Sequence, residues 1–309
     1  MGAKVIMACR SVERGEAARI NMEEEIRESW PTTAGADASR RQAGSAVVNA
    51  GTLEVMKCDL GSLESVREFA KAFEAKHGRQ LDVLVNNAGI GITSADITTD
   101  GLDSCFGVNY IGHFALTIEL MPLIQSTAGA RVICLSSFMH HFGCTEWESS
   151  AGGHQGHFGR STYADSKFAM TLFAKELNRR FNAAGSSATA FSVNPGAVRS
   201  DIWRNVPKLV MPAYDLIMRL LYLNVEEGCH TSVCTAVMPL ENLSDGDYYQ
   251  PYWLPFGCRF PFELMGPFVG CAPAMPSLPS DEPTASAEMW AASERIIKAA
   301  DAARRGARG

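Results

Sequence analysis

Residues 81–89, LDVLVNNAG, decide the fold class, because a run of strand-forming residues passes directly into a turn of polar and small residues. Other apolar runs end in the same way, at 4–9, 52–58, 130–135 and 189–193. Helix-like segments lie between them, at 12–28, 62–76, 99–124 and 161–181. This alternation predicts an α/β protein with a parallel sheet. We expect the turn-forming clusters at one edge of that sheet, where open α/β sheets bind ligands.

Composition and charge exclude several classes of protein. The 309 residues are 46% hydrophobic, enough for a substantial core, and the net charge of -6 argues against nucleic acid as a partner. Nine scattered cysteines without a C-x-x-C pair are typical of reduced thiols in a cytosol-like compartment. No apolar run reaches the roughly 18 residues of a membrane-spanning helix, and residues 1–30 lack a signal-peptide pattern. We expect a cytoplasmic protein, or a membrane-associated or organellar one if a lost N-terminus carries an anchor or transit peptide.

Residues 161–170, STYADSKFAM, place Tyr163 and Lys167 four positions apart on a predicted helix. This spacing puts both side chains on one helix face, one turn apart. An ammonium near a phenol stabilises the phenolate, so Lys167 is expected to lower the pKa of Tyr163 from about 10 and let it exchange a proton near neutral pH. The pair by itself also fits an ordinary solvated helix face, and the neighbouring motifs favour the chemical interpretation.

Other polar residues gather where the neighbouring predicted strands end. Ser136 and Ser137 follow the fourth strand, where a hydroxyl can hydrogen-bond a substrate oxygen as charge shifts onto it. The turn at 86–89 lets a planar ligand approach the backbone, and the Pro-Gly pair at 195–196 can present backbone groups to a ring. Asn109 is a poor helix former in an otherwise apolar helix, and its alternative role is a hydrogen-bonded core amide.

These motifs, in this order and spacing, resemble the short-chain dehydrogenase/reductase family over residues 2–250. The matching motifs are N-N-A-G from Asn86, the asparagine at 109, the strand-end serine, Y-x-x-S-K from Tyr163 and P-G from Pro195. A closer likeness is to the retinol-dehydrogenase-like branch, which includes WW-domain oxidoreductases and protochlorophyllide-reductase-like enzymes. The segments that carry it are GAKVIMACRS, CDLGSLESVREFA, TTDGLDSCFGVNYIGHF, SSFMHH and MWAASERI. The resemblance implies a Rossmann-type doubly wound parallel sheet flanked by helices.

The resemblance also implies an activity, the interconversion of an alcohol and a carbonyl group by hydride transfer, and a role for each matching residue. Tyr163 would be the general acid and base, and Lys167 would lower its pKa and hold the nicotinamide ribose hydroxyls. Ser137, rather than Ser136, would orient the substrate oxygen, because the family's serine occupies the second position of such a pair. Asn109 would hold a water that links Lys167 to bulk solvent. The expected partner is a small apolar alcohol or carbonyl compound, for example a retinoid- or steroid-like one.

The implied cofactor is a nicotinamide dinucleotide, NADP in preference to NAD. Arg10 distinguishes them, because an acidic residue at this strand end would hold a ribose 2′-hydroxyl whereas an arginine accommodates a 2′-phosphate. The alternative is that Arg10 simply begins the next helix in solvent. Asp59 would bind adenine, and Ser200 stands where the family commonly has threonine. The expected cofactor-binding residues are Arg10, Asp59, Leu60, Asn86, Ala88, Gly89, Asn109, Tyr163, Lys167, Pro195, Gly196, Val198 and Ser200.

One motif of the family, the phosphate loop T-G-x-x-x-G-I-G after the first strand, has no counterpart in these 309 residues. In a sheet of order 3-2-1-4-5-6 the first strand lies between the second and the fourth, so its absence leaves two strands with unpaired backbone groups. We therefore expect residues 4–9 to be the second strand of the fold, and the gene model to be incomplete or its start codon placed too late. The alternative is an inactive remnant or scaffold that does not bind dinucleotide.

The C-terminal part of the chain is less regular. Residues 226–237 predict a helix, 246–252 a last strand and 282–305 a terminal helix. We expect residues 1–250 to form the dinucleotide-binding domain, and 251–309 to form a proline- and aromatic-rich segment with a helix that packs on the same domain.

Two other features of the sequence are candidate sites. The aromatic stretch 248–268 is expected to pack on the protein's own core, the alternatives being a cover over the active site, a homo-oligomer interface and a membrane-surface contact. Histidines cluster in one loop without a partner set of cysteines or carboxylates, so we expect no metal site there. These histidines are His140, His141, His154 and His157.

Overall fold

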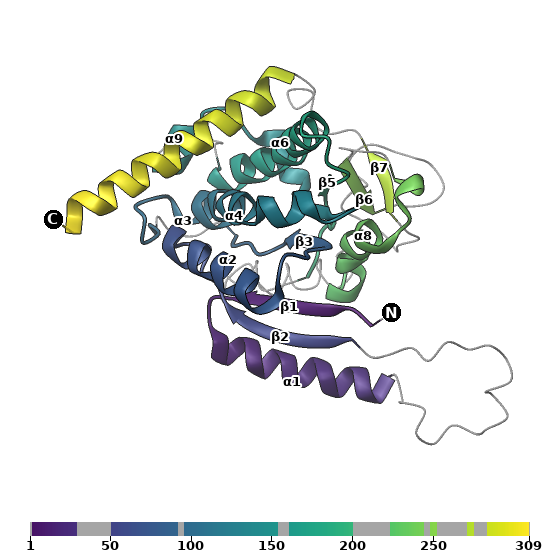
Figure 1. The fold of residues 1–309 in the computed structure, drawn as a ribbon. Coiled ribbons are helices and arrows are strands. Elements are labelled where there is room, and N and C mark those ends of the chain that lie inside the picture. Colours follow the sequence, from purple (N-terminus) through teal and green to yellow (C-terminus); the bar gives the residue numbers. More distant parts are fainter. Residues whose placement is uncertain are drawn as a thin grey trace, which may run out of the picture.

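Strands and helices alternate along the chain in the computed structural model, which confirms the predicted α/β class (Figure 1). The structure describes residues 2–29, 51–91, 96–153, 161–199, 223–243, 248–251, 271–274 and 283–308. The strands are β1 (Lys4–Cys9), β2 (Thr52–Lys57), β3 (Val83–Asn86), β4 (Arg131–Leu135), β5 (Thr189–Val193), β6 (Tyr248–Pro251) and β7 (Cys271–Ala274). The longer helices are α1 (Val12–Ser29), α2 (Leu63–His77), α4 (Gly112–Ser126), α6 (Thr162–Ala183), α8 (Val225–Val237) and α9 (Pro283–Arg308).

The larger sheet has five strands in the order β3-β4-β5-β6-β7. The first four are parallel, and β7 pairs antiparallel with β6. The antiparallel strand was not predicted, because the proline-rich stretch around it has no clear alternation. The parallel strands bring their carboxyl ends to one edge, and this edge carries the predicted polar turns.

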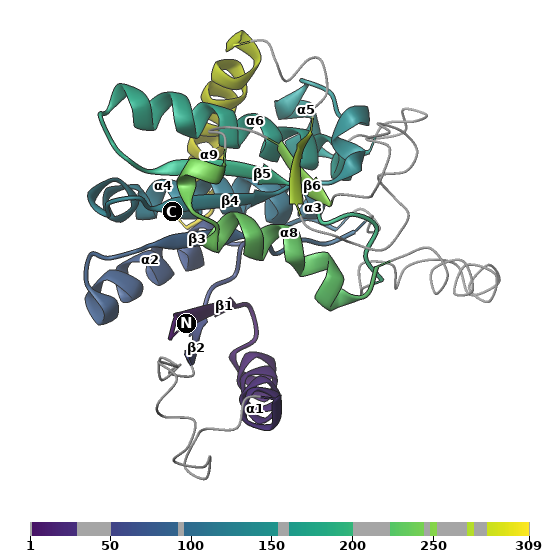
Figure 2. The ribbon, with the colours of Figure 1, turned by 90° about the vertical axis from the view of Figure 1, so that its right-hand side faces the viewer.

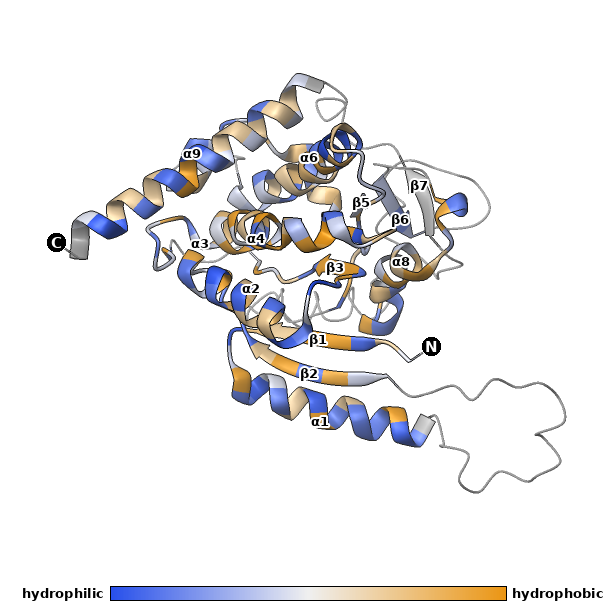
Figure 3. Cartoon of the chain, in the orientation of Figure 1, coloured by the Kyte–Doolittle hydropathy of each residue, from blue (hydrophilic) through white to orange (hydrophobic). Residues whose placement is uncertain are grey.

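Both faces of this sheet are buried at β4 and β5, where side chains alternate between two cores. On β4, Val132 and Cys134 belong to the main core with α2, α4, α6 and α9, whereas Ile133 and Leu135 belong to a second core under α8. Figure 3 shows the matching hydropathy, since α4 is largely hydrophobic and α1, on the outside of the molecule, is largely hydrophilic. Helix α6, which carries Tyr163 and Lys167, is therefore held in the main core along most of its length.

The N-terminal strands form a separate two-stranded parallel sheet, in which β1 pairs with β2 from Lys4 opposite Thr52 to Cys9 opposite Lys57. Figure 2 shows this pair and α1 on one side of the larger sheet. Within the described ranges, the second edges of β1 and β3 have no neighbouring strand. Val5 on β1 and Val85 on β3 are 46% and 42% exposed, high values for strands of a doubly wound sheet. The unpaired edges expected from the sequence are thus present.

The predicted helix 99–124 is divided into three parts. A short turn α3 (Ser104–Phe106) leads into a π-helix η2 (Gly107–Ile111), and α4 follows. Glycines at both ends of η2 allow close packing, because a Cβ on Gly112 would lie 2.3 Å from the carbonyl oxygen of Leu60 and one on Gly107 would lie 2.8 Å from the methyl of Thr98. The glycines at 107 and 112 therefore leave room for Thr98 and Leu60 to pack against this wide turn. Single π-helical turns are frequent at functional sites.

Short helical turns that were not predicted follow β4. They are the 3-10 helix η3 (Phe138–Phe142) and helix α5 (Trp147–Gly152), and a third, η5 (Leu240–Asn242), follows α8. Asp165 of α6 holds the segment between η3 and α5, because its carboxylate accepts hydrogen bonds from the Cys144 N–H at 2.9 Å and the Ser150 hydroxyl at 2.8 Å. The two bonds therefore fix the segment after β4 to the N-terminal part of α6.

Candidate active site

Helix α6 carries Tyr163 and Lys167 one turn apart near its N-terminus. Lys167 is only 5% exposed, and its ammonium donates a hydrogen bond to the Leu135 carbonyl oxygen at 3.0 Å. That oxygen lies at the carboxyl end of β4, so the lysine is tied to the sheet edge. The Lys167 Nζ lies 5.6 Å from the centre of the Tyr163 ring. The two side chains therefore share one face, as the spacing predicts.

Burial dominates the proton affinities of this pair. It lowers the pKa of Lys167 to about 8, because the charged ammonium loses its hydration. It also raises the pKa of Tyr163 to about 12, against a smaller lowering by the hydrogen bond with Ser137. The expected net lowering of the tyrosine pKa is therefore contradicted, because desolvation outweighs the other influences on this phenol. Spacing on a helix reports that two groups are close, whereas desolvation depends on everything packed around them.

The two serines after β4 have different environments. Ser136 is 2% exposed, and its hydroxyl donates to the Lys167 carbonyl oxygen at 2.8 Å and lies 2.8 Å from the Thr171 hydroxyl. Ser137 is partly exposed, caps η3 by accepting from the Met139 N–H at 3.3 Å, and hydrogen-bonds Tyr163. Ser137, and not Ser136, thus lies against the tyrosine with part of its surface accessible.

Asn109 is fully buried in the π-helix η2 and binds the backbone of Ile90 at two points. Its Oδ1 accepts from the Ile90 N–H at 2.7 Å, and its Nδ2 donates to the Ile90 carbonyl oxygen at 2.9 Å. The Nδ2 also lies 3.4 Å from the Ser166 hydroxyl on α6. Asn109 is thus a hydrogen-bonded core amide, as one of the two interpretations predicts, and it lies near Lys167.

Hydrogen bonds of Asn86 and His113 fix the turn that follows β3, and the last residues of this turn are exposed. Asn86 is buried, and its Nδ2 donates to the Thr117 hydroxyl at 2.9 Å. The Ala88 carbonyl oxygen accepts from His113 Nε2 at 2.8 Å, while Ala88 and Gly89 are themselves exposed. A Cβ on Gly89 would lie 3.4 Å from Asn109 Oδ1 and 3.7 Å from Lys167 Nζ. Glycine thus keeps the space between this turn and the lysine open.

The strand ends of the smaller sheet hold the residues predicted for the adenosine half of a dinucleotide. Arg10 is exposed at the end of β1, and its carbonyl oxygen accepts from Lys57 Nζ at 2.8 Å. Asp59 follows β2, and its Oδ1 accepts from the Gly61 N–H at 2.9 Å. Leu60, partly exposed, packs against Gly112 at the start of α4.

The last predicted turn follows β5. Gly196 adopts φ +80, a backbone conformation that favours glycine, and its N–H donates to Asn194 Oδ1 at 3.0 Å. Pro195 is partly exposed beside it, and Val198 forms an isolated parallel bridge with Leu223. Ser200 lies outside the described residues.

Two site residues were missed by the sequence analysis, Cys105 and His113. The Cys105 sulfur lies 3.3 Å from Asn109 Nδ2, and burial raises the pKa of this thiol to about 12. Burial lowers the pKa of His113 to about 4, so its ring is neutral and its Nδ1, among the described residues, has no hydrogen-bond partner. Cys105 and His113 stand four positions before and after Asn109, and this spacing is the sequence pattern that could have identified them.

The predicted histidine loop is described only in part. His140 is fully buried, with Nδ1 2.7 Å from the Ser137 carbonyl oxygen and its ring 4.8 Å from that of Tyr248. His141 stacks on it at 4.0 Å. His154 and His157 lie outside the described residues. Over the part of the chain that the structure describes, no three His, Cys, Asp or Glu side chains are grouped for a metal ion.

The arrangement can therefore exchange one proton beside an exposed glycine turn. Tyr163 and Ser137 present hydroxyls beside each other, and Lys167 supplies a buried positive charge behind them. The exposed turn at Gly89 lies next to this lysine, because a Cβ on Gly89 would lie 3.7 Å from Lys167 Nζ.

Comparison with known proteins agrees with this site. A family model described as short chain dehydrogenase matches residues 34–209. The chain belongs to the short-chain dehydrogenase family, and it is an NAD(P)-dependent oxidoreductase of the class that acts on CH–OH groups. Both the family and the retinol-dehydrogenase-like branch predicted from the sequence are confirmed.

Individual relatives place the chain within the family. It is 35% identical to human retinol dehydrogenase 14 over 251 residues, which are 81% of this chain and 71% of that protein. It is 36% identical to human polyprenol dehydrogenase over 194 residues, 60% of this chain and 57% of that one. The crystal structure of an uncharacterized protein from Mycobacterium paratuberculosis is 29% identical, with a TM-score of 0.66 over 96% of this chain and 85% of that chain. Within the described ranges, no helix is long and apolar enough to cross a membrane.

Proposed function

We propose that this protein interconverts an alcohol and a ketone or aldehyde on an apolar substrate, with NADP as cofactor. The single observation that carries the proposal is the convergence of Ser137, Tyr163 and Lys167 at the carboxyl edge of β4, with an open glycine turn facing the lysine. Each group alone has a structural explanation. Their combination at the ligand-binding edge of a parallel sheet is typical of proton transfer coupled to a bound ring.

Each residue has a defined task in this proposal. Ser137 hydrogen-bonds the substrate oxygen beside the Tyr163 hydroxyl, which gives its proton to the forming alkoxide in reduction and takes it back in oxidation. Lys167 holds the ribose hydroxyls and stabilises negative charge on the tyrosine oxygen. Asn109 keeps the turn at Ile90 in place and opens a path for a water to Lys167. The dinucleotide, when bound, supplies or accepts the hydride.

The apolar nature of the proposed substrate is supported by the side chains beside Ser137. Phe138 and Phe142 follow it on η3 with ring centres 5.8 Å apart, and Phe142 is 56% exposed. The relatives with retinol and polyprenol in their names act on long apolar alcohols, which supports the same class. An aromatic surface next to a hydroxyl pair favours a substrate with one polar oxygen on an apolar body.

The choice of NADP rests on Arg10. Its exposed side chain at the end of β1 can pair with a 2′-phosphate, and no acidic residue stands at that strand end. We expect Arg10→Asp to weaken NADPH binding by on the order of tenfold and to leave NADH binding almost unchanged, because only NADPH carries the phosphate. Fluorescence titration with both dinucleotides measures this. Equal weakening for both would contradict the proposal.

The reaction itself is tested with the protein and a panel of apolar alcohols, aldehydes and ketones. We expect turnover with a nicotinamide dinucleotide, and its loss in Tyr163→Phe with dinucleotide affinity retained, since the variant lacks only the proton donor. A protein that binds no dinucleotide in a thermal-shift titration would instead support the alternative of an inactive scaffold. Binding with unchanged turnover in Tyr163→Phe would exclude the assigned role of the tyrosine.

A further inference from the structure

The residue after Asn109 connects the active site to the C-terminal helix. Tyr110 is fully buried in the same π-helical turn, and its hydroxyl lies 2.6 Å from the Ser293 hydroxyl of α9. Ser293 also hydrogen-bonds the Met289 carbonyl oxygen at 2.8 Å, so its hydroxyl connects Tyr110 to the backbone of α9. The Met289 sulfur is a further contact of the tyrosine hydroxyl. Both of these contacts of the Tyr110 hydroxyl are therefore with residues of α9.

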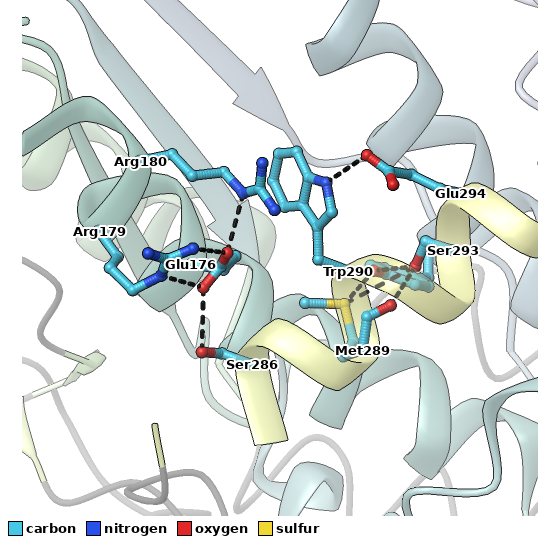
Figure 4. Close-up of polar contacts among 9 residues, drawn as sticks. Glu176, Arg179, Arg180, Ser286, Met289, Trp290, Ser293 and Glu294 are labelled. Atoms are coloured by element: carbon cyan, nitrogen blue, oxygen red, sulfur yellow. Dashed lines mark hydrogen bonds and ion pairs between the residues drawn. The ribbon is translucent and has the colours of Figure 1, made fainter. Parts of the chain in front are cut away.

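Helix α9 is anchored over this region by an aromatic and ionic contact with α6. The Trp290 ring packs edge-on against Phe114 of α4 at 4.9 Å, and the Arg180 guanidinium lies 3.7 Å over its centre. Figure 4 shows the polar side of the contact, where the buried Glu176 binds Arg179 at 2.6 Å and Arg180 at 2.8 Å. The Ser286 hydroxyl of α9 also donates a hydrogen bond to the Glu176 carboxylate at 3.3 Å. Glu176 is nine residues after Lys167 on α6, so this contact is remote from the lysine.

The opposite side of the turn holds the active site. Tyr110 and Asn109 are consecutive, so the wide turn that carries one side chain toward α9 carries the other toward Ile90. A π-helical turn is rare and occurs mostly as a single turn within an α-helix, so an α-helical turn is its alternative, and that change would rotate both side chains. Glycines at 107 and 112 permit the wide turn but supply no side-chain contact to hold it.

We propose that α9 acts as a positioning element for the reaction, and that Tyr110 and Ser293 are the positioning residues through which it holds Asn109 on the Ile90 backbone. This inference rests on the proposed function for its kinetic consequence only. The structural consequence, the protection of the Ile90 amide, does not depend on any activity. In this view the helix that follows the region matched by the family model is part of the machinery that shapes the site.

The test compares two buried serines on the same helix. Ser293→Ala removes the partner of Tyr110, whereas Ser286→Ala removes a hydroxyl that faces Glu176, with 5% exposure at 286 and none at 293. Both lose one hydroxyl from the α9 contact, so they are matched for general destabilisation. The measurement is the exchange rate of the Ile90 amide hydrogen by NMR, together with kcat, KM and the pH profile of kcat.

We expect Ser293→Ala to raise the Ile90 exchange rate by about fivefold and to lower kcat by a similar factor, with KM for the alcohol almost unchanged. Its kcat pH profile should shift as well, because Asn109 lies next to Lys167. Ser286→Ala should match the wild type in all of these measurements. Equal changes in both variants, or no change at Ile90 in Ser293→Ala, would overturn the proposal.

Tyr110→Phe tests the same hydrogen bond from its other end and serves if Ser293→Ala does not fold. We expect the double variant Tyr110→Phe/Ser293→Ala to exchange at Ile90 no faster than either single variant, because all three lack one and the same bond. Additive effects of the two substitutions would overturn the pairing. If the wild-type protein turns over no alcohol, the proposed function fails, and the exchange measurements still decide the role of α9.

Discussion

The side-chain amide of Asn109 binds both the N–H and the carbonyl oxygen of Ile90, at 2.7 and 2.9 Å. One side chain thereby satisfies both backbone hydrogen-bonding groups of Ile90. The contact joins the π-helical turn to the end of β3, and it sets the distance between the open turn at Gly89 and the Lys167 ammonium.

Loss of this contact should affect catalysis as well as stability. We expect Asn109→Ala to lower kcat by about tenfold or more and to lower the free energy of unfolding by about 1–3 kcal/mol, since two buried backbone groups lose their partner. Steady-state kinetics and urea unfolding measure the two effects.

The chain offers a matched control in Asn178, which binds the Ala190 backbone in the same way, at 2.7 Å to both the N–H and the carbonyl oxygen. Asn178→Ala should lose comparable stability but keep its turnover. If both asparagine variants lose the same fraction of kcat, the loss at Asn109 reflects stability alone, and its positioning role is wrong.

Substitution of Ser137 and of Ser136, the two serines after β4, should have different effects on kcat. We expect Ser137→Ala to lower kcat by on the order of a hundredfold, because the hydroxyl beside Tyr163 no longer stabilises charge on the substrate oxygen. In the adjacent Ser136→Ala variant, the lost bonds are to the Lys167 carbonyl oxygen and Thr171 inside the core, so stability should fall and turnover should persist. The opposite ranking of the two kcat values would contradict the assignment of Ser137.

Buried Lys167 should leave a signature in the pH dependence of stability. Its pKa is about 8 in the folded protein and about 10.4 in an unfolded chain, so the unfolded state binds more protons between these values. The folded state carries the full penalty of burying the charge below pH 8 and loses it as the pH rises toward 10.4. The free energy of unfolding should therefore gain on the order of 3 kcal/mol across that window, relative to a Lys167→Met variant.

Urea unfolding of both proteins between pH 7.5 and 10.5 checks this expectation. Other groups titrate over the same range, but they are common to both proteins and cancel in the difference. A difference between wild type and Lys167→Met that stays constant with pH would show that Lys167 keeps an ordinary pKa.

The unpaired edges of β1 and β3 should be visible in hydrogen exchange. We expect backbone amides that point away from the partner strand on β1 and β3 to exchange much faster than those of β4, which is bonded to strands on both sides. Exchange followed by mass spectrometry or NMR gives the comparison within one sample. Protection of the β1 and β3 edges equal to that of β4 would mean that these amides have partners in solution.

Local sequence determined the order of the elements and the identity of the polar turns. Strands and helices begin and end within a few residues of their predicted bounds, because apolar runs, turn residues and helix periodicity act over short distances. The motif spacing was also enough to predict which residues meet, since carboxyl ends of parallel strands share one edge. The family and its branch followed from the same motifs.

The tertiary structure determined the environment of those residues and therefore their pKa values. The raised pKa of Tyr163 and the lowered pKa of Lys167 come from burial, which no spacing along one helix reveals. The π-helical turn at Asn109 depends on Leu60 and Thr98 packing against two glycines, and the contact between Tyr110 and Ser293 joins residues 183 positions apart. Desolvation and long-range packing are properties of the folded core, so the sequence determined which groups form the site and the tertiary structure determined their chemistry.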